Sequence, residues 1–157
     1  MMKSIAAALV CAIEPAPGEE TAMEKHWTRA GGATGEKFIC VVTFLPVRRW
    51  RDIVAFIRMS VRIEAQLKRS PSLVGYGLKT NLPGKQFWTL SVWNERRAVN
   101  GFVGSEPHAT AVKRFERWAG PGAAFAEWES AHSQPSWDEA LKKLETPTFY
   151  YQPTASR

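Results

Sequence analysis

The sequence has little of what most recognisable chemical sites are built from. Its 157 residues contain only three histidines and two cysteines, Cys11 and Cys40. Neither cysteine lies in a CxxC motif or a metal-spaced cluster, so a disulfide framework and a zinc site have no support. Glycine-rich phosphate loops, serine-hydrolase signatures and nucleic-acid-binding motifs are also missing. Any chemistry must therefore rest on a few side chains.

Long hydrophobic runs are missing too. The apolar run at residues 5–13 has nine residues, whereas a helix needs roughly 20 to cross a bilayer. No membrane span is predicted. The run resembles a short signal peptide but lacks a small-residue cleavage site, so we expect a cytoplasmic, reducing location, with export as the alternative.

Positive charge is concentrated in one segment. The chain has a net charge of +6, and residues 48–69 hold seven basic residues against Asp52 and Glu64. Arg51, Arg58, Arg62 and Arg69 recur at spacings that place them on one stripe of a helix. We interpret this stripe as a solvated outer face, with an anion contact as the alternative, and we predict no nucleic-acid partner.

The pattern of apolar residues predicts one α+β domain at residues 37–146. It lies between a flexible or signal-like N-terminal arm at 1–36, rich in glycine and proline, and a C-terminal tail at 147–157. Strands are expected at 38–45, 73–81, 87–93 and 124–129, and helices at 50–69, 95–102 and 106–118, with Asn94 as a possible cap. Ser136, with Glu139 three residues on, predicts a capping box that opens a last helix. The order β-α-β-β-α-β plus a C-terminal helix is the split βαβ plan of ferredoxin-like domains.

A ferredoxin-like sheet carries helices on only one face. The strand at 38–45 is apolar on both faces, so the opposite face of the sheet is expected to be bare and to expose an apolar patch. A second copy of the chain is the simplest cover for such a patch. We therefore predict a homodimer formed through the sheet face.

His108 is the strongest candidate for chemistry. At about 100° per residue it falls in the centre of the apolar arc of the helix at 106–118, together with Val112 and Phe115. Glu64 and Ser60 lie in the apolar arc of the first helix, so both helices are expected to aim these polar groups into one space. A buried carboxylate needs a partner, and His108 is the obvious one.

The predicted site follows from this placement. His108 would act as a general base with Glu64 orienting it, or as a heme ligand, and a packed core histidine is the third reading. A rim position beside an arginine is the alternative for Glu64. Tyr76, Trp88 and Trp93 lie on neighbouring strands and could contact a flat ligand, although packing alone also explains the tryptophans. The predicted substrate-binding residues are Ser60, Tyr76, Trp88, Trp93, Val112 and Phe115.

The element order and several short motifs resemble one superfamily. The aromatic strand at 87–93, followed by Ala98, Phe102 and the Ser105-x-Pro107-His108 sequence, is similar to the dimeric α+β barrel proteins of the antibiotic-biosynthesis-monooxygenase-like superfamily. Within it, the chain resembles an uncharacterised group related to spheroidene monooxygenase, and Trp118, Trp128 and Trp137 fit that group's pattern. The resemblance covers residues 38–144. It implies a dimeric ferredoxin-like fold in a superfamily that contains cofactor-free monooxygenases, heme-degrading enzymes and heme enzymes.

Three functions follow from the residues and the resemblance. The leading hypothesis is a monooxygenase-like homodimer that holds an apolar aromatic or polyene molecule between its helices and sheet, without a cofactor. The second is a heme-binding enzyme with His108 as the axial ligand. Alignment with the heme-degrading branch places its histidine at Val112, one helical turn from His108. The third is a non-catalytic binding or structural dimer.

Overall fold

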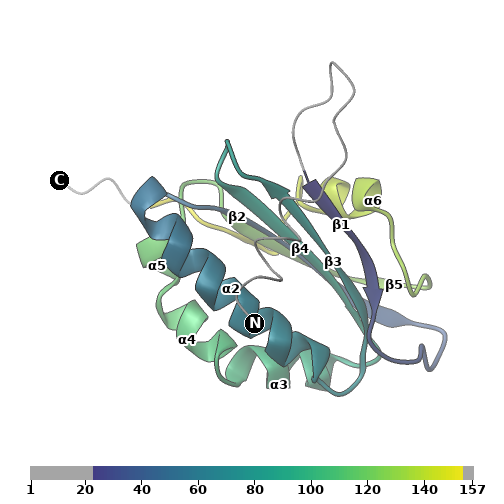
Figure 1. Cartoon of the computed structure of the whole chain (residues 1–157). Helices are drawn as coiled ribbons and strands as arrows, with labels where there is room; N and C mark the ends of the chain where they lie inside the picture. Colours follow the sequence, from purple (N-terminus) through teal and green to yellow (C-terminus); the bar gives the residue numbers. More distant parts are fainter. Residues whose placement is uncertain (1–22, 154–157) are drawn as a thin grey trace.

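The computed structural model describes residues 23–153, with side chains from Trp27 onward. The N-terminal segment 1–22, which contains Cys11 and the signal-like run, lies outside the described residues. Two layers of helices enclose one sheet (Figure 1). The elements follow one another as β1 (Met23–Arg29), β2 (Phe38–Pro46), η1 (Trp50–Asp52), α2 (Ile53–Lys68), β3 (Leu73–Asn81), β4 (Gln86–Trp93), α3 (Arg96–Gly104), α4 (His108–Lys113), α5 (Phe115–Trp118), β5 (Ala124–Ser130), α6 (Trp137–Lys143) and β6 (Phe149–Tyr150).

The sheet is antiparallel, with the strand order β1-β3-β4-β2-β5-β6. Its four central strands have the order of a split βαβ unit, so the predicted α+β ferredoxin-like fold is confirmed. The two outer strands come from segments expected to lack structure. β1 belongs to the predicted arm at 1–36, and β6 to the predicted tail at 147–157. Both predictions are corrected at these residues, because each segment gains backbone hydrogen bonds from a free sheet edge.

β2 and β4 form the centre of the sheet, and their two faces differ in burial. Val42 lies opposite Leu90 on β4 and Ala126 on β5, and all three are buried. One position further along, Thr43 lies opposite Thr89 and faces the other side, where both residues are only half-buried. Because side chains alternate along a strand, the two faces differ in chemistry.

The long helix α2 and the shorter α3, α4 and α5 cover one face of the sheet (Figure 1). Apolar residues of α2 pack there, with Phe56 and Met59 buried against Trp118 and Leu67 against Trp93. The predicted helix at 106–118 is broken at Arg114, whose backbone leaves the helical region at φ −97° and ψ 4°. Asn94 does not cap α3. Its side chain instead bonds Thr34 N and Gly32 O in the loop before β2, which fixes that loop against the end of β4.

The opposite face is not bare, which corrects the expectation drawn from the fold plan. α6 lies across it, and Ala140 packs on Val42, Leu90 and Ala126. Gly77 leaves room for the Trp137 ring, since a Cβ there would lie 3.3 Å from it. Gly75 similarly admits Trp27, whose ring atoms would lie 2.5 Å from a Cβ. The C-terminal helix and two tryptophans therefore supply cover that was expected from a second copy.

The start of α6 agrees with the predicted capping box, because Ser136 Oγ accepts a hydrogen bond from Glu139 N at 3.1 Å. Glu139 then accepts a hydrogen bond from Trp128 Nε1 at 2.9 Å. These two bonds tie the helix to β5. Among the described helices, none is long and apolar enough to cross a membrane.

Candidate functional site

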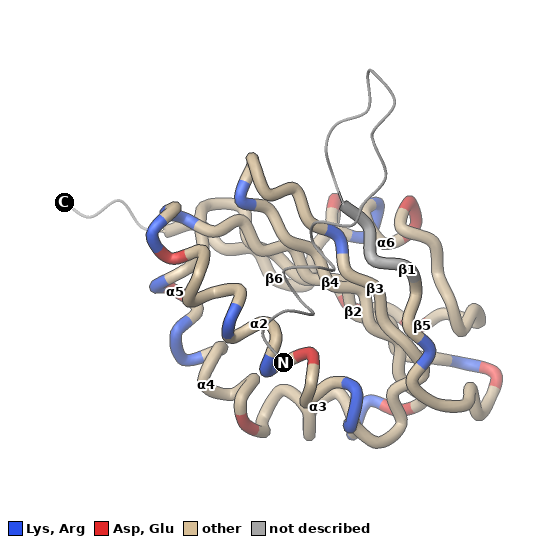
Figure 2. Tube along the Cα trace, in the orientation of Figure 1, with Lys and Arg blue, Asp and Glu red and all other residues tan. Residues whose placement is uncertain are grey.

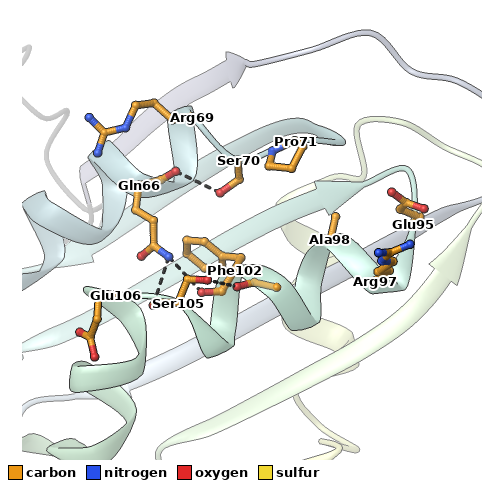
Figure 3. A pocket seen from close by; sticks show the side chains of 11 residues that line it. Gln66, Arg69, Ser70, Pro71, Glu95, Arg97, Ala98, Phe102, Ser105 and Glu106 are labelled. Atoms are coloured by element: carbon orange, nitrogen blue, oxygen red, sulfur yellow. Dashed lines mark hydrogen bonds between the residues drawn. The ribbon is translucent and has the colours of Figure 1, made fainter.

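His108 is held in place by a side chain from a different helix. Gln66 on α2 donates from Nε2 to the carbonyl oxygens of Phe102 at 3.0 Å and Ser105 at 3.2 Å, and its Oε1 accepts from His108 N at 3.1 Å. The first two bonds satisfy carbonyls at the end of α3, and the third satisfies an N–H at the start of α4. One amide thus joins three helices at the point where His108 begins α4, and Figure 3 shows Gln66 beside Phe102 and Ser105.

The imidazole of His108 is half-buried beside aromatic rings. Its ring centroid lies 4.7 Å from that of Phe102, which in turn lies 5.4 Å from the ring of Trp93. Burial lowers the pKa of His108 below its usual range, and the nearby Val103 backbone partly opposes this shift. The contact is not a hydrogen bond to Nδ1. Nδ1 is buried and has no hydrogen-bond partner. The ring is therefore neutral near pH 7 and retains an unused polar atom.

Glu64 is engaged elsewhere, and the expected pair with His108 is not formed among the described residues. Glu64 Oε1 accepts from the Tyr76 hydroxyl at 2.7 Å and lies 3.2 Å from Lys68 Nζ. Burial and the neighbouring Glu64 carboxylate raise the pKa of Tyr76, which keeps the phenol protonated. Gln66 is two positions after Glu64, which corresponds to a rotation of about 200° around a helix. Glu64 therefore turns to β3 while Gln66 turns to α3 and α4.

The other predicted ligand contacts are scattered over the domain. Ser60 donates to Phe56 O within its own helix. Trp93 is buried on the helix-covered face and donates from Nε1 to Ser91 Oγ at 3.0 Å. Trp88 lies on the opposite face, stacked on Phe44 at 5.0 Å, so it cannot share a pocket with His108.

The break at Arg114 explains the placement of the remaining two residues. Val112 is 51% exposed, although the continuous helix predicted from the sequence would have turned it inward. Phe115 packs instead against Tyr151, at 5.0 Å between ring centroids, and against Phe149. Of the predicted site residues, the structure brings His108 near Trp93 through Phe102 and pairs Glu64 with Tyr76, and Tyr76 and Trp93 share one buried cluster.

Sequence reasoning missed Gln66 and Phe102. A glutamine beside charged residues on an amphipathic helix looks like a surface position, and its three partners are backbone atoms that carry no sequence signal. Phe102 offered a usable signal, because it lies six residues before His108 at the end of an aromatic strand–helix segment. Two missed polar atoms, Asp52 Oδ2 and Trp118 Nε1, are also buried and have no partner.

A cleft of about 490 Å³ opens between the end of α2 and α3. Figure 3 shows Gln66, Phe102, Ser105 and Glu106 along it, with Arg69 and Arg97 at its sides. None of the predicted site residues lines it. Phe102 lies between this cleft and the imidazole, so the cleft reaches the neighbourhood of His108 without reaching its ring.

The described residues do not fit a heme beside His108. An axial ligand needs a flat open space over the ligating nitrogen, yet the imidazole packs on Phe102 and does not line the cleft. No group of three or more metal-ligating side chains occurs within residues 23–153. We derive no chemistry through a heme.

The fold is similar to that of solved structures described as antibiotic biosynthesis monooxygenases. Solved structures with this fold include an antibiotic biosynthesis monooxygenase, at a TM-score of 0.52 and 12% identity over 59% of this chain and 97% of that one. A putative antibiotic biosynthesis monooxygenase from Nitrosomonas europaea matches at a TM-score of 0.51 and 12% identity, over 62% of this chain and 92% of that one. A protein from Pseudomonas aeruginosa matches at a TM-score of 0.53 and 11% identity, over 64% of this chain and 98% of that one.

These likenesses support the ferredoxin-like α+β fold of the single chain. A scan against models of protein families finds no match. A search of curated proteins finds none either. Function must therefore be argued from the residues of this chain.

Proposed function

We propose that the protein is a monooxygenase-type enzyme that acts on an apolar, aromatic or polyene molecule, with His108 as its general base. The observation that carries the proposal is the buried Nδ1 of His108, which has no hydrogen-bond partner. A buried polar atom without a partner costs roughly 1–3 kcal/mol. A ligand with an acidic C–H or O–H group that enters from the neighbouring cleft would remove this cost by bonding to Nδ1, once the Phe102 ring between the cleft and the imidazole turns aside.

The surroundings of His108 favour an aromatic ligand. Phe102 and Trp93 continue from the imidazole as a row of rings, and aromatic ligands gain from stacked or edge-to-face contact with such rings. On the same helix-covered face, the paired Thr43 and Thr89 are half-buried polar residues between two apolar clusters. Apolar walls with few polar groups are typical of small-molecule sites.

The proposed reaction needs no cofactor if the substrate supplies its own electrons. Neutral His108 removes a proton from an activated methylene group, and the resulting carbanion reduces O₂. One oxygen atom becomes the new carbonyl oxygen, and the other leaves as water with the two methylene hydrogens. The lowered pKa of His108 keeps the base in its neutral form at pH 7.

Anthrone, a three-ring ketone with an acidic methylene group, is a suitable probe. We expect the wild-type protein to accelerate oxygen uptake and anthraquinone formation, with one water formed per O₂ consumed. His108→Gln should reduce the rate by about 10²–10⁴, the usual contribution of a general base. His132→Gln is the matched control, because His132 is exposed.

Two results would contradict the proposal. Equal rates in the wild type and His108→Gln would remove the base role and favour a non-catalytic binding protein. A Soret band in protein expressed with added heme, lost in His108→Gln, would instead support the heme-binding alternative. The predicted homodimer remains a prediction, which analytical ultracentrifugation of the wild type tests.

A further inference from the structure

The outer surface of the helical layer carries a strong and uncompensated positive charge. Residues 48–69 and 108–118 hold ten basic side chains, and all ten are exposed: Arg48, Arg49, Arg51, Arg58, Arg62, Lys68, Arg69, Lys113, Arg114 and Arg117. Of the three acidic residues in the same segments, only Glu116 is exposed. Their surplus of seven exceeds the net charge of +6 of the whole chain. Figure 2 shows Lys and Arg positions along α2, α4 and α5.

Large apolar side chains are exposed within this basic surface. Trp50 is 58% exposed, Val54 67% and Val112 51%. Val54 lies about one helical turn from Arg51 in η1 and from Arg58 in α2, so its side chain is in the middle of the arginine stripe. These residues stay exposed to water outside the packed apolar face of α2. Apolar side chains grouped on a surface and bordered by polar residues are typical of a surface that contacts a partner or a membrane.

Trp50 lies at the end of the molecule where several chain segments meet. Lys85 Nζ lies 5.2 Å above its ring. Val47 N bonds Lys85 O, and Arg48 N bonds Trp118 O. The Trp50 ring therefore lies beside a cation of the β3–β4 turn, and its chain neighbours Arg49 and Arg51 are both exposed.

We propose that this basic face, with Trp50 and Val54 as apolar anchors, docks on an anionic lipid bilayer. Basic side chains are attracted to anionic headgroups, and a tryptophan inserts at the boundary between headgroups and acyl chains. A nucleic acid would also attract the charge. The sequence of a nucleic acid, however, is read by polar side chains among the basic ones, whereas the exposed residues between the basic ones of 48–69 are Trp50, Val54, Ala55 and Ala65. The docking does not depend on the proposed catalytic role of His108.

Vesicle co-sedimentation of the full chain tests the docking. The protein should bind phosphatidylcholine vesicles that contain phosphatidylserine, bind pure phosphatidylcholine vesicles much more weakly, and lose affinity as salt is raised. Each basic residue near an anionic surface is worth roughly a fivefold change in partition coefficient, so Arg58→Gln/Arg62→Gln should weaken binding about 25-fold. Trp50→Ala should also weaken vesicle binding relative to the wild type, and this loss should persist at high salt, where the apolar contact remains.

The control removes the same charge from the other side of the sheet. Lys142→Gln/Lys143→Gln changes two exposed residues of α6 and should leave vesicle binding within about twofold of the wild type. The proposal is overturned if the protein does not bind anionic vesicles, or if both double variants weaken binding equally. Binding to a DNA duplex but not to vesicles would also overturn it and assign the face to a nucleic acid. Because all four substitutions are exposed, unchanged thermal melts should accompany them.

Discussion

The two sides of the sheet differ in how completely their polar groups are satisfied. On the α6 side, Trp128 bonds Glu139, and Ser136 caps the helix. On the side of α2–α5 lie all three buried side-chain atoms that have no partner within residues 27–153, in Asp52, His108 and Trp118. A fully satisfied layer has a structural role, whereas unused buried polar atoms are tolerated where a ligand completes them. A ligand site is therefore expected on the α2–α5 side of the sheet.

Changes on the α6 side should affect stability alone. Leu90 is 1% exposed and packs in the cluster with Val42 and Ala140. Leu90→Ala should lower the free energy of unfolding by about 2–5 kcal/mol, because it removes buried methyl groups and leaves a cavity. Urea unfolding measures this. The exposed control Val54→Ala should change stability by less than about 0.5 kcal/mol.

If Leu90→Ala also shifted the pKa of His108, the two layers would not be independent. An NMR titration of the imidazole protons in the wild type and the variant decides this. We expect identical titration curves, since the sheet lies between the two groups.

Changes at Gln66 should affect stability and the site together. Gln66→Met keeps the length of the side chain but removes three hydrogen bonds, which should cost about 1–3 kcal/mol for a half-buried group. The backbone amide signal of His108 and its imidazole titration should both shift. Gln134→Met, at an exposed position, is the control. Unchanged His108 signals in Gln66→Met would mean that the amide does not position the histidine.

The smallest expected effect is the pH dependence of stability that comes from His108. The folded-state pKa of His108 lies below its unfolded value, which is about 6.5. As pH falls below about 6.5, the unfolded chain takes up a proton that the folded protein does not. Stability should therefore fall by up to about 1.4 kcal/mol per pH unit until the folded-state pKa is reached.

Urea unfolding at several pH values compares variants for this effect. His108→Gln should lose this contribution to the slope, and the exposed His132→Gln should keep it. Equal slopes in all three proteins would show that His108 is not buried as a neutral ring.

Sequence patterns predicted the framework well and the site less well. The strand at 73–81 was predicted with its observed bounds, because Ser70-Pro71 before it and Pro83-Gly84 after it are turn signals. The helix at 106–118 was wrong in its continuity. It contains no glycine, and its single proline lies at the start, so nothing local signalled the break at Arg114.

The pairing of Glu64 with His108 failed for a geometric reason. An apolar arc shows that a residue faces the interior, but not which flank of the helix it turns to. Glu64 and Gln66 are both half-buried but lie on opposite flanks of α2, where β3 packs beside the first and α3–α4 beside the second. The polar group that meets His108 is therefore the amide, and the carboxylate meets Tyr76.

The position of α6 limits how two copies of this chain can meet. Packed sheets lie about 10 Å apart, and a helix with its side chains is about 10–12 Å across, so α6 fills the thickness that a facing sheet would need. Direct sheet-on-sheet contact is blocked along the row from Gly77 to Ala126. We expect any association through this face to form beside the helix, at the end where Phe44 stacks on Trp88, with the two sheets offset from each other.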